Sequence, residues 1–300
     1  MKDYIVFTVG SNKQTAKDFA RFWNCQLGKV SVKKFADGEE LVKIQTSVVD
    51  KDVIVIESTA KKPNDRIMEI LMLLDSINRD HPRSVTLIIP YLGYSRQERV
   101  NYEFEPVSCE VMAKVIETAH YDKLMSLDLH HPIIESFFTR GIENLQSTEV
   151  FANYYLSYMR ENGLTGKDIV VVSPDHGSNY RADSLVFALR GARKVICEKK
   201  RPEPDRVEHL VINGDVKDKV CIIIDDIIST GNTIASATKL LYKAGAKIVL
   251  VGATHGVFSA GSVENMLKAG VEDIAVTNSI EQKVEGVKVL DIFQLLISNL

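Results

Sequence analysis

An unbroken apolar run at residues 220–224, Val-Cys-Ile-Ile-Ile, is followed directly by Asp225 and Asp226. Such a run is typical of a parallel strand that other elements cover on both faces. We expect the strand to end at the two aspartates and a helix to occupy residues 234–244. The run therefore predicts an α/β protein with a mostly parallel sheet.

The segment between that strand and that helix is polar and rich in hydroxyl groups. Amides at a helix N-terminus have no partner within the helix and attract phosphate, so the segment is predicted to bind a phosphate group. The two aspartates would stand where open α/β sheets bind ligands, within reach of sugar hydroxyls or a phosphate-bound Mg²⁺. A sugar phosphate is the predicted ligand, and a capping loop with solvated acids is the alternative. The candidate phosphate-binding residues are Ser229, Thr230, Gly231, Asn232 and Thr233.

The composition is that of a globular chain without a nucleic-acid surface. Of its 300 residues, 45% are hydrophobic and 26% are charged, and the formal net charge is −3 without a long basic run. The four cysteines are widely spaced, which argues against a disulfide framework and against a zinc site. No apolar run is long enough for a membrane span, and the first residues are too polar for a signal peptide. These features predict a cytoplasmic protein that contacts neither nucleic acid nor a membrane.

The order strand, loop, one-faced helix and buried strand occurs twice in the chain. Residues 53–91 show this order first, and residues 220–254 show it again. Only the second copy carries the hydroxyl-rich loop. We infer two similar, doubly wound, mostly parallel α/β domains that comprise residues 1–146 and 147–300.

Polar segments near other predicted strands are ambiguous when each is taken alone. Residues 35–39, Phe-Ala-Asp-Gly-Glu, join strand candidates at 30–34 and 41–45 and are typical of an ordinary hairpin turn. Residues 91–99 combine arginines and tyrosines that suit a nucleotide, with a solvated turn as the alternative. Near the start of the chain, Ser11 and Gln14 form a capping-box pattern that predicts a helix to about residue 27.

Further candidates follow the later strands. After a strand at 123–127, a histidine acts as a metal ligand, a phosphate donor or a structural residue, and we assign the structural role to His131. Asp175 follows a strand at 168–172 and suits a helix cap as well as a ligand. Residues 199–206 mix charges with prolines, which predicts a mobile loop whose cations close over an anion.

In this order the motifs resemble those of the ribose-phosphate pyrophosphokinases, or 5-phosphoribosyl-1-pyrophosphate (PRPP) synthetases, over nearly the whole chain. Residues 220–233 resemble the PRPP-binding motif that this family shares with type I phosphoribosyltransferases. Residues 35–39 are similar to its Phe-Ser-Asp-Gly-Glu loop, and residues 91–99 to Tyr-x-Gly-Tyr-Ala-Arg-Gln-Asp-Arg. The resemblance implies a phosphoribosyltransferase-like fold. It also implies transfer of the pyrophosphoryl group of ATP to the 1-hydroxyl of ribose 5-phosphate, for nucleotide biosynthesis.

The resemblance further implies roles for single residues. The ATP-binding residues would be Phe35, Asp37, Gly38, Glu39, Arg96 and Gln97, with the Phe35 ring on the adenine. Mg²⁺ would lie at His130 and Asp175, and the catalytic residues would be Lys199 and Arg201. Ribose 5-phosphate would be bound by Arg201, Asp225, Asp226, Ser229, Thr230, Gly231, Asn232 and Thr233. The implied partners are ATP, ribose 5-phosphate and further copies of the chain in a homo-oligomer built from dimers.

Three positions depart from the commonest bacterial pattern of this family. Ser229 replaces an acid, Ser178 replaces a second glycine, and Val49 replaces a frequent arginine. A serine at the first position occurs in phosphoribosyltransferases and archaeal-type synthetases, so ligand binding is expected to persist. With Val49, the resemblance leaves open whether ADP and phosphate control the protein. The alternatives are a phosphoribosyltransferase, which needs no ATP-directed first half, and a non-catalytic synthetase subunit, in which Lys199 or the metal positions would be disrupted.

Overall fold

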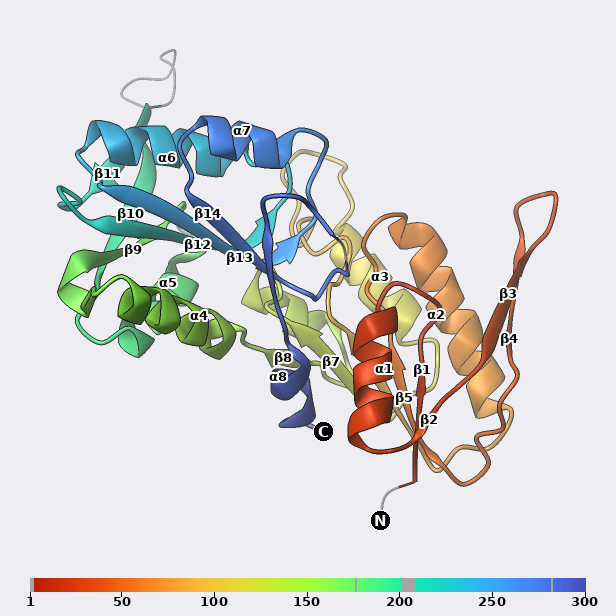
Figure 1. The fold of residues 1–300 in the computed structure, drawn as a ribbon. Helices are drawn as coiled ribbons and strands as arrows, with labels where there is room; N and C mark the ends of the chain where they lie inside the picture. Colours follow the sequence, from red (N-terminus) through yellow and green to blue (C-terminus); the bar gives the residue numbers. More distant parts are fainter. Residues whose placement is uncertain (1–2, 176, 201–208, 282) are drawn as a thin grey trace. The chain divides into compact units, whose positions relative to one another are not determined.

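The structure is a computed structural model that describes residues 3–175, 177–200, 209–281 and 283–300 (Figure 1). The chain forms two compact units. The first unit comprises Met1–Leu145, Ser279–Glu281 and Phe293–Leu300, and the second comprises Gln146–Asn278 and Gln282–Ile292. The end of the chain therefore belongs to the first unit. The expected division of ligands between two halves of the chain stays a prediction.

A parallel six-stranded sheet with the order β2-β1-β5-β6-β7-β8 forms the centre of the first unit. The order changes direction between β1 and β5, and α/β sheets bind ligands at such a switch point. Every residue of β5 is buried, as expected for a strand that is covered on both faces. The strands are β1 (Tyr4–Phe7), β2 (Gln26–Leu27), β5 (Asp52–Ile56), β6 (Ser84–Ile89), β7 (Lys123–Leu127) and β8 (Glu143–Leu145).

Helices cover both faces of this sheet because successive side chains of a strand point to opposite faces. On one face, Ile5, Val53 and Leu87 pack against α2 (Pro63–Asn78) and α3 (Ser108–Ile116). The other face is covered by α1 (Lys13–Phe22) and α8 (Phe293–Ile297), where the rings of Phe19 and Phe293 meet edge to face at 5.2 Å between centroids. The 3₁₀ helix η1 (Pro132–Phe137) follows β7.

The second unit has a seven-stranded sheet with the order β11-β10-β9-β12-β13-β14-β15. All neighbours are parallel except β10 and β11, which are antiparallel. The switch point lies between β9 and β12. The strands are β9 (Ile169–Ser173), β10 (Arg193–Lys200), β11 (His209–Asn213), β12 (Val220–Ile228), β13 (Ile248–Gly256), β14 (Asp273–Thr277) and β15 (Lys288–Leu290).

Two separate cores cover the two faces of the second sheet. On one face, β12 residues such as Ile223 pack against α6 (Asn232–Lys243) and α7 (Ser262–Lys268). On the other face, Ile222 belongs to the core that includes α4 (Thr148–Glu161) and α5 (Asn179–Ala188). A 3₁₀ turn, η2 (Gly166–Asp168), precedes β9. The unit is thus a sheet between two helical layers.

The two units repeat one plan. In each unit the second parallel strand lies at the outside of the first, and the following parallel strands extend the sheet in the other direction. Each unit also has an antiparallel insertion between its second and third parallel strands. In the first unit the insertion is the hairpin of β3 (Val30–Lys34) and β4 (Glu40–Ile44), which projects from the rest of the unit (Figure 1), and in the second it includes β11. The prediction of two similar doubly wound domains is confirmed.

Three predicted element boundaries were wrong. The strand β12 continues through both aspartates to Ile228, because β13 continues beside it and pairs with it to Gly256. The first helix ends at Phe22, well before residue 27. Ser11 is also no helix cap, because the carboxylate of Glu281 accepts hydrogen bonds from the amides of Gln14 and Thr15, at 3.0 and 2.7 Å. A cap from so distant a residue leaves no local sequence signal.

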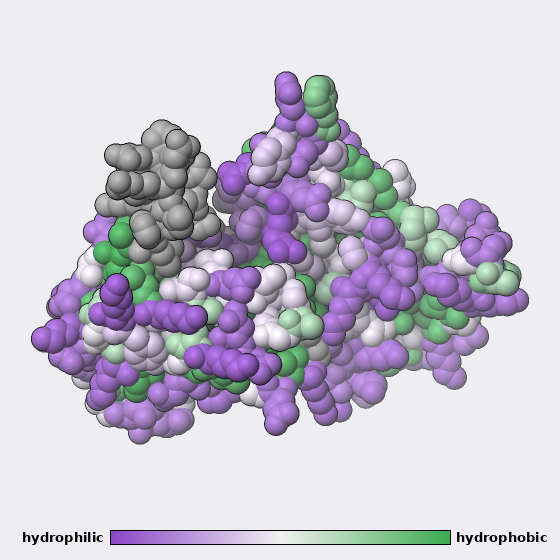
Figure 2. Space-filling model, turned by 90° about the horizontal axis from the view of Figure 1, so that it is seen from above, coloured by the Kyte–Doolittle hydropathy of each residue, from purple (hydrophilic) through white to green (hydrophobic). Residues whose placement is uncertain are grey.

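On the face shown in Figure 2, hydrophobic side chains are scattered among hydrophilic ones. In the part of the chain that the structure describes, no helix combines the length and the apolar character that a membrane span needs.

Candidate active site

The loop from β12 to α6 forms a cradle of backbone amides in the second unit. Gly231 precedes α6 with φ at +71°, a left-handed angle that favours glycine. The amides of Gly231 and Thr233 have no acceptor within the described part of the chain. The side chain of Thr230 is exposed beside them. A phosphate group here would meet free amides, a hydroxyl and the positive end of a helix.

The segment after β13 fixes the shape of this cradle. The Ser259 amide donates to the Ser229 carbonyl at 2.9 Å, and Asn265 Nδ2 donates to Asn232 Oδ1 at 2.9 Å. A Cβ atom at Gly231 would lie 3.0 Å from the Ser262 carbonyl oxygen, so α7 approaches too closely for a larger residue. The structure therefore brings the five predicted phosphate-binding residues together in one supported loop.

Asp225 and Asp226 lie just before the cradle, on neighbouring positions of β12. Asp225 Oδ1 accepts hydrogen bonds from Ser178 Oγ at 2.5 Å and from the Asp226 amide at 2.9 Å. Burial raises the pKa of Asp225 well above its ordinary value, and the neighbouring Asp226 acts in the same direction. Asp226 is buried, and its Oδ2 lies 3.9 Å from an amino group of the buried Arg181. The pair thus combines a strongly desolvated acid with one beside a cation.

Asp175 follows β9, the neighbour of β12 at the switch point. Its side chain is exposed, and its Oδ1 accepts from the Ser178 amide at 3.0 Å. Ser178 thus connects Asp175 with Asp225. Neither Ser178 nor Arg181 was predicted to be a site residue. A cation in the first turn of a helix is unfavourable for the helix dipole, and this was the only local signal at Arg181.

Of the two predicted catalytic residues, the structure describes Lys199. Lys199 is in β10, where its backbone pairs with Leu210 of β11. The prediction that it begins a loop was wrong, because the pairing with β11 extends the strand to Lys200. Arg201 lies outside the described residues, as does most of the predicted loop at 199–206.

The predicted ATP-binding residues 35–39 form the tip of the β3–β4 hairpin in the first unit. Asp37 Oδ1 accepts from the Glu39 amide at 3.1 Å, and Gly38 has φ at +96° with open space around it. The Phe35 ring is 41% exposed, and Lys33 Nζ lies 4.8 Å from its centroid. The turn is therefore an ordered hairpin turn whose aromatic ring and acids face solvent.

Arg96 and Gln97 follow β6 in a turn whose neighbouring residues are buried. Their own side chains are exposed, whereas Ser95 and Glu98 are buried. The Gln97 amide donates to the Tyr94 carbonyl at 2.9 Å. Among the described residues, no hydrogen bond or ion pair joins Arg96 or Gln97 to the hairpin tip. Arg96 and Gln97 are thus positioned independently of the hairpin tip at residues 35–39.

His130 lies at the carboxyl end of β7 and is partly buried. Its neighbour His131 has the structural role that was expected, since its Nδ1 accepts from the Ile133 amide at 3.1 Å and caps η1. Asp128, two residues before His130, is buried with φ at +38°, a strained backbone angle of the kind found at functional sites. No group of three ligand side chains gathers anywhere in the described residues.

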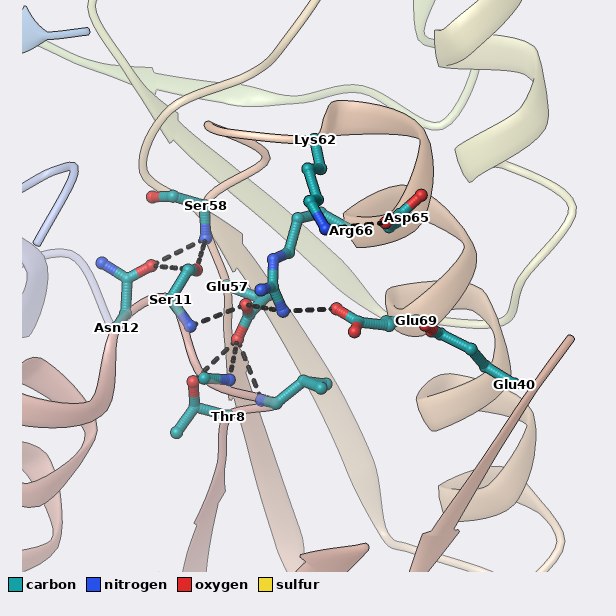
Figure 3. A network of polar contacts seen from close by, with 12 residues as sticks. Thr8, Ser11, Asn12, Glu40, Glu57, Ser58, Lys62, Asp65, Arg66 and Glu69 are labelled. Carbon is teal, nitrogen blue, oxygen red and sulfur yellow. Dashed lines mark hydrogen bonds and ion pairs between the residues drawn. The ribbon is translucent and has the colours of Figure 1, made fainter. Parts of the chain in front are cut away.

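The switch point of the first unit is closed by Glu57 (Figure 3). Glu57 directly follows the apolar run of β5, as Asp225 follows that of β12. Its side chain is fully buried. The donors to this carboxylate are the hydroxyl of Thr8 at 2.7 Å and the amides of Val9, Gly10 and Ser11 at 2.9, 3.0 and 2.8 Å. A side chain of the protein thus occupies the anion position of the first unit.

Two family models match the chain. Residues 4–119 match the N-terminal domain of ribose phosphate pyrophosphokinase, and residues 190–300 match the phosphoribosyl synthetase-associated domain. The ribose-phosphate pyrophosphokinase of Bacillus subtilis is 38% identical over 299 residues, which cover 98% of this chain and 92% of the relative. That of Corynebacterium ammoniagenes is 37% identical over 295 residues, with 97% and 91% covered.

A solved structure agrees with this relationship. The crystal structure of phosphoribosylpyrophosphate synthetase from Mycobacterium smegmatis superposes with a TM-score of 0.90 at 30% identity. The match covers 99% of this chain and 97% of that one. Sequence and fold therefore agree over both units, and the chain belongs to the ribose-phosphate pyrophosphokinase family.

Proposed function

We propose that the protein transfers the pyrophosphoryl group of ATP to the 1-hydroxyl of ribose 5-phosphate, giving PRPP and AMP for nucleotide biosynthesis. The observation that carries the proposal is the amide cradle of the second unit, with paired carboxylates beside it, in a chain related to this family over its full length. The hydroxyl oxygen forms a bond to the β-phosphorus while the bond from that phosphorus to the oxygen of AMP breaks.

The cradle supplies the chemistry for the 5-phosphate of the sugar. Free amides of Gly231 and Thr233 and the exposed Thr230 hydroxyl are donors for phosphate oxygens, and the α6 dipole favours the negative charge. Asp225 and Asp226 lie on β12 just before the cradle, and their carboxylates suit the ribose hydroxyls. Ser229 replaces an acid of the common pattern, so it adds a hydroxyl donor instead of a negative charge.

We assign ATP binding to the first unit. The exposed ring of Phe35 offers a face for the adenine, and the exposed guanidinium of Arg96 suits phosphate oxygens. Asp37, Gly38, Glu39 and Gln97 are assigned to the same ligand from the family resemblance. Glu57 already accepts hydrogen bonds from the amides at the switch point of the first unit, which supports an ATP site elsewhere in that unit.

The metal that this family needs is proposed to be Mg²⁺, bound with His130 and Asp175. Asp175 fits this role because its side chain is exposed and its Oδ2 forms no hydrogen bond or ion pair with the described part of the chain. A carboxylate with phosphate and water ligands is the usual environment of Mg²⁺ in such enzymes. When bound, the ion would neutralise phosphate charge and orient the triphosphate.

Lys199 and Arg201 are proposed as the catalytic cations. Phosphoryl transfer asks little covalent chemistry of a protein, so alignment and charge stabilisation supply most of the rate. Lys199 lies in β10, where that strand pairs with β11, and Arg201 is assigned from the family resemblance. From the family resemblance we further propose a homo-oligomer that is built from dimers and acts in the cytoplasm.

A direct assay tests the proposal. The purified chain is incubated with ATP, MgCl₂ and ribose 5-phosphate, and AMP and PRPP are followed by ³¹P NMR. We expect equal amounts of the two products, no reaction without ribose 5-phosphate, and loss of activity with EDTA that Mg²⁺ restores. Formation of neither product would contradict the proposal. Consumption of PRPP with a free nucleobase, but not of ATP, would instead identify a phosphoribosyltransferase.

A further inference from the structure

We propose that Thr59 is a positioning residue for ATP binding: its buried hydroxyl holds the turn at residues 91–93 and thereby places Arg96 and Gln97. The inference rests on the proposed function for its ligand. The role of Thr59 in holding the turn concerns only contacts within the first unit. It can therefore be tested separately from the identity of the ligand.

The Thr59 hydroxyl bridges both sides of the turn. It donates to the Tyr91 carbonyl at 3.0 Å and accepts from the Gly93 amide at 2.6 Å. The Thr59 amide also donates to the Tyr91 carbonyl, at 3.0 Å. Thr59 is 0% exposed, so water cannot replace its hydroxyl without a movement of the chain. This one side chain therefore closes the turn that leads to Arg96.

The fit between Thr59 and Gly93 leaves no spare room. A Cβ atom at Gly93 would lie 3.0 Å from the Thr59 carbonyl oxygen and 3.1 Å from both Thr59 Oγ1 and Pro63 Cβ. Gly93 has no positive φ, so close approach and not backbone conformation is the reason for glycine here. The turn is thus seated against the segment after β5 by contact as well as by hydrogen bonds.

The neighbours of Thr59 fix it in turn. Ser58, one residue earlier, accepts at its Oγ from the Tyr91 amide at 3.3 Å, and its amide donates to Asn12 Oδ1 at 2.7 Å. The Ser58 hydroxyl donates to the Ser279 carbonyl. With Glu57 bound to the loop after β1 (Figure 3), these three consecutive residues join the loops after β1, β5 and β6.

The position of this group explains its use. After β12 in the second unit, the amides of Gly231 and Thr233 are free in the described part of the chain, whereas after β5 in the first unit Glu57 accepts hydrogen bonds from the loop after β1. Glu57 therefore serves as an internal support of the first unit. The turn that Thr59 closes leads to Tyr94, whose carbonyl accepts a hydrogen bond from the Gln97 amide at 2.9 Å. The exposed side chains of Arg96 and Gln97 follow directly.

The test compares Thr59→Val, which removes the hydroxyl and keeps the shape, with Thr59→Ser, which keeps the hydroxyl. Thr238→Val is the matched control, because it removes another fully buried threonine hydroxyl in the second unit. Each variant is assayed for kcat and for both KM values. Binding of α,β-methylene-ATP is measured by calorimetry, and hydrogen exchange is followed in peptides that cover residues 91–99.

We expect Thr59→Val to raise the KM for ATP and the Kd of the analogue about tenfold, with kcat and the KM for ribose 5-phosphate changed less than twofold. Exchange at residues 91–99 should rise. Thr59→Ser should restore wild-type values, and Thr238→Val should leave both readouts unchanged. If Thr59→Val does not fold, Gly93→Ala should show the same pattern, because it forces the turn away from Thr59.

An unchanged KM for ATP in Thr59→Val would overturn the proposal, and so would equal changes in all kinetic constants. A Thr59→Ser variant as impaired as Thr59→Val would also overturn it. If the wild-type chain forms no AMP, the proposed function fails, and analogue binding with hydrogen exchange still decides the role of Thr59.

Discussion

Replacing Gly231 by alanine tests whether the cradle depends on both a left-handed backbone angle and the close approach of α7. The chain offers a matched control in Gly261, which precedes α7 as Gly231 precedes α6. The two residues have φ of +71° and +76° and ψ of 0°. A Cβ atom at Gly231 would lie 3.0 Å from the Ser262 carbonyl oxygen and 3.1 Å from Met266 Cγ, whereas one at Gly261 would meet nothing within 4 Å.

The free energies of unfolding of the two variants should therefore differ only by the cost of the steric overlap at Gly231. The left-handed angle costs alanine about 1 to 2 kcal/mol, and a stiffer unfolded chain offsets roughly 0.4 to 1 kcal/mol of this. Gly261→Ala should thus lower the free energy of unfolding by about 1 kcal/mol. Gly231→Ala adds overpacking against a backbone oxygen, which costs about 1 to 3 kcal/mol, so its total loss should be about 2 to 4 kcal/mol.

Urea unfolding measures the stability difference, and steady-state kinetics measures its consequence for the cradle. Far-UV circular dichroism follows both units, while the fluorescence of the single tryptophan, Trp23, reports on the first unit only. We expect the Gly231→Ala chain to raise the KM for ribose 5-phosphate at least tenfold, because the shifted amides fit the phosphate poorly. Gly261→Ala should leave this KM within twofold. Equal loss of stability and equal KM values in the two variants would refute the reasoning.

Three further predictions follow from single side chains. Lys199→Ala should lower kcat by about two to three powers of ten, since a lost transition-state contact costs about 3 to 4 kcal/mol in such sites. Near-normal turnover would show that Lys199 is not catalytic. Glu57→Ala should lower the free energy of unfolding by about 3 to 5 kcal/mol, because three amides and a hydroxyl lose their acceptor. Glu57→Gln should lose less stability, and equal urea midpoints for the two variants would contradict this prediction. Hydrogen bonds from the Ser47 hydroxyl and the Val48 amide lower the pKa of Asp80 from 3.8. Its contribution to stability is therefore present above that pH and lost as the pH falls through the lowered value, so wild type should lose stability more steeply than Asp80→Asn below pH 4 in acid titrations.

Much of the second unit could be predicted from its sequence. The run at 220–224 predicted a buried parallel strand, because a strand that is covered on both faces buries successive apolar side chains. Gly231 and its hydroxyl-bearing neighbours predicted the turn and the helix start, because turn formation and helix initiation depend on single residues and on the backbone next to them. The repeated order of elements then indicated two doubly wound units, and the strand orders agree.

Other features were decided by residues that are distant in the sequence. Glu281 caps α1 across most of the chain, and Glu57 fills the first switch point by accepting hydrogen bonds from a loop some fifty residues earlier. Ser178 and Arg181 reach Asp225 and Asp226 only because β9 and β12 are neighbours in the sheet. Local patterns determine backbone propensity and which faces are apolar, whereas partners for buried polar groups depend on strand order, which brings the ends of non-consecutive strands together.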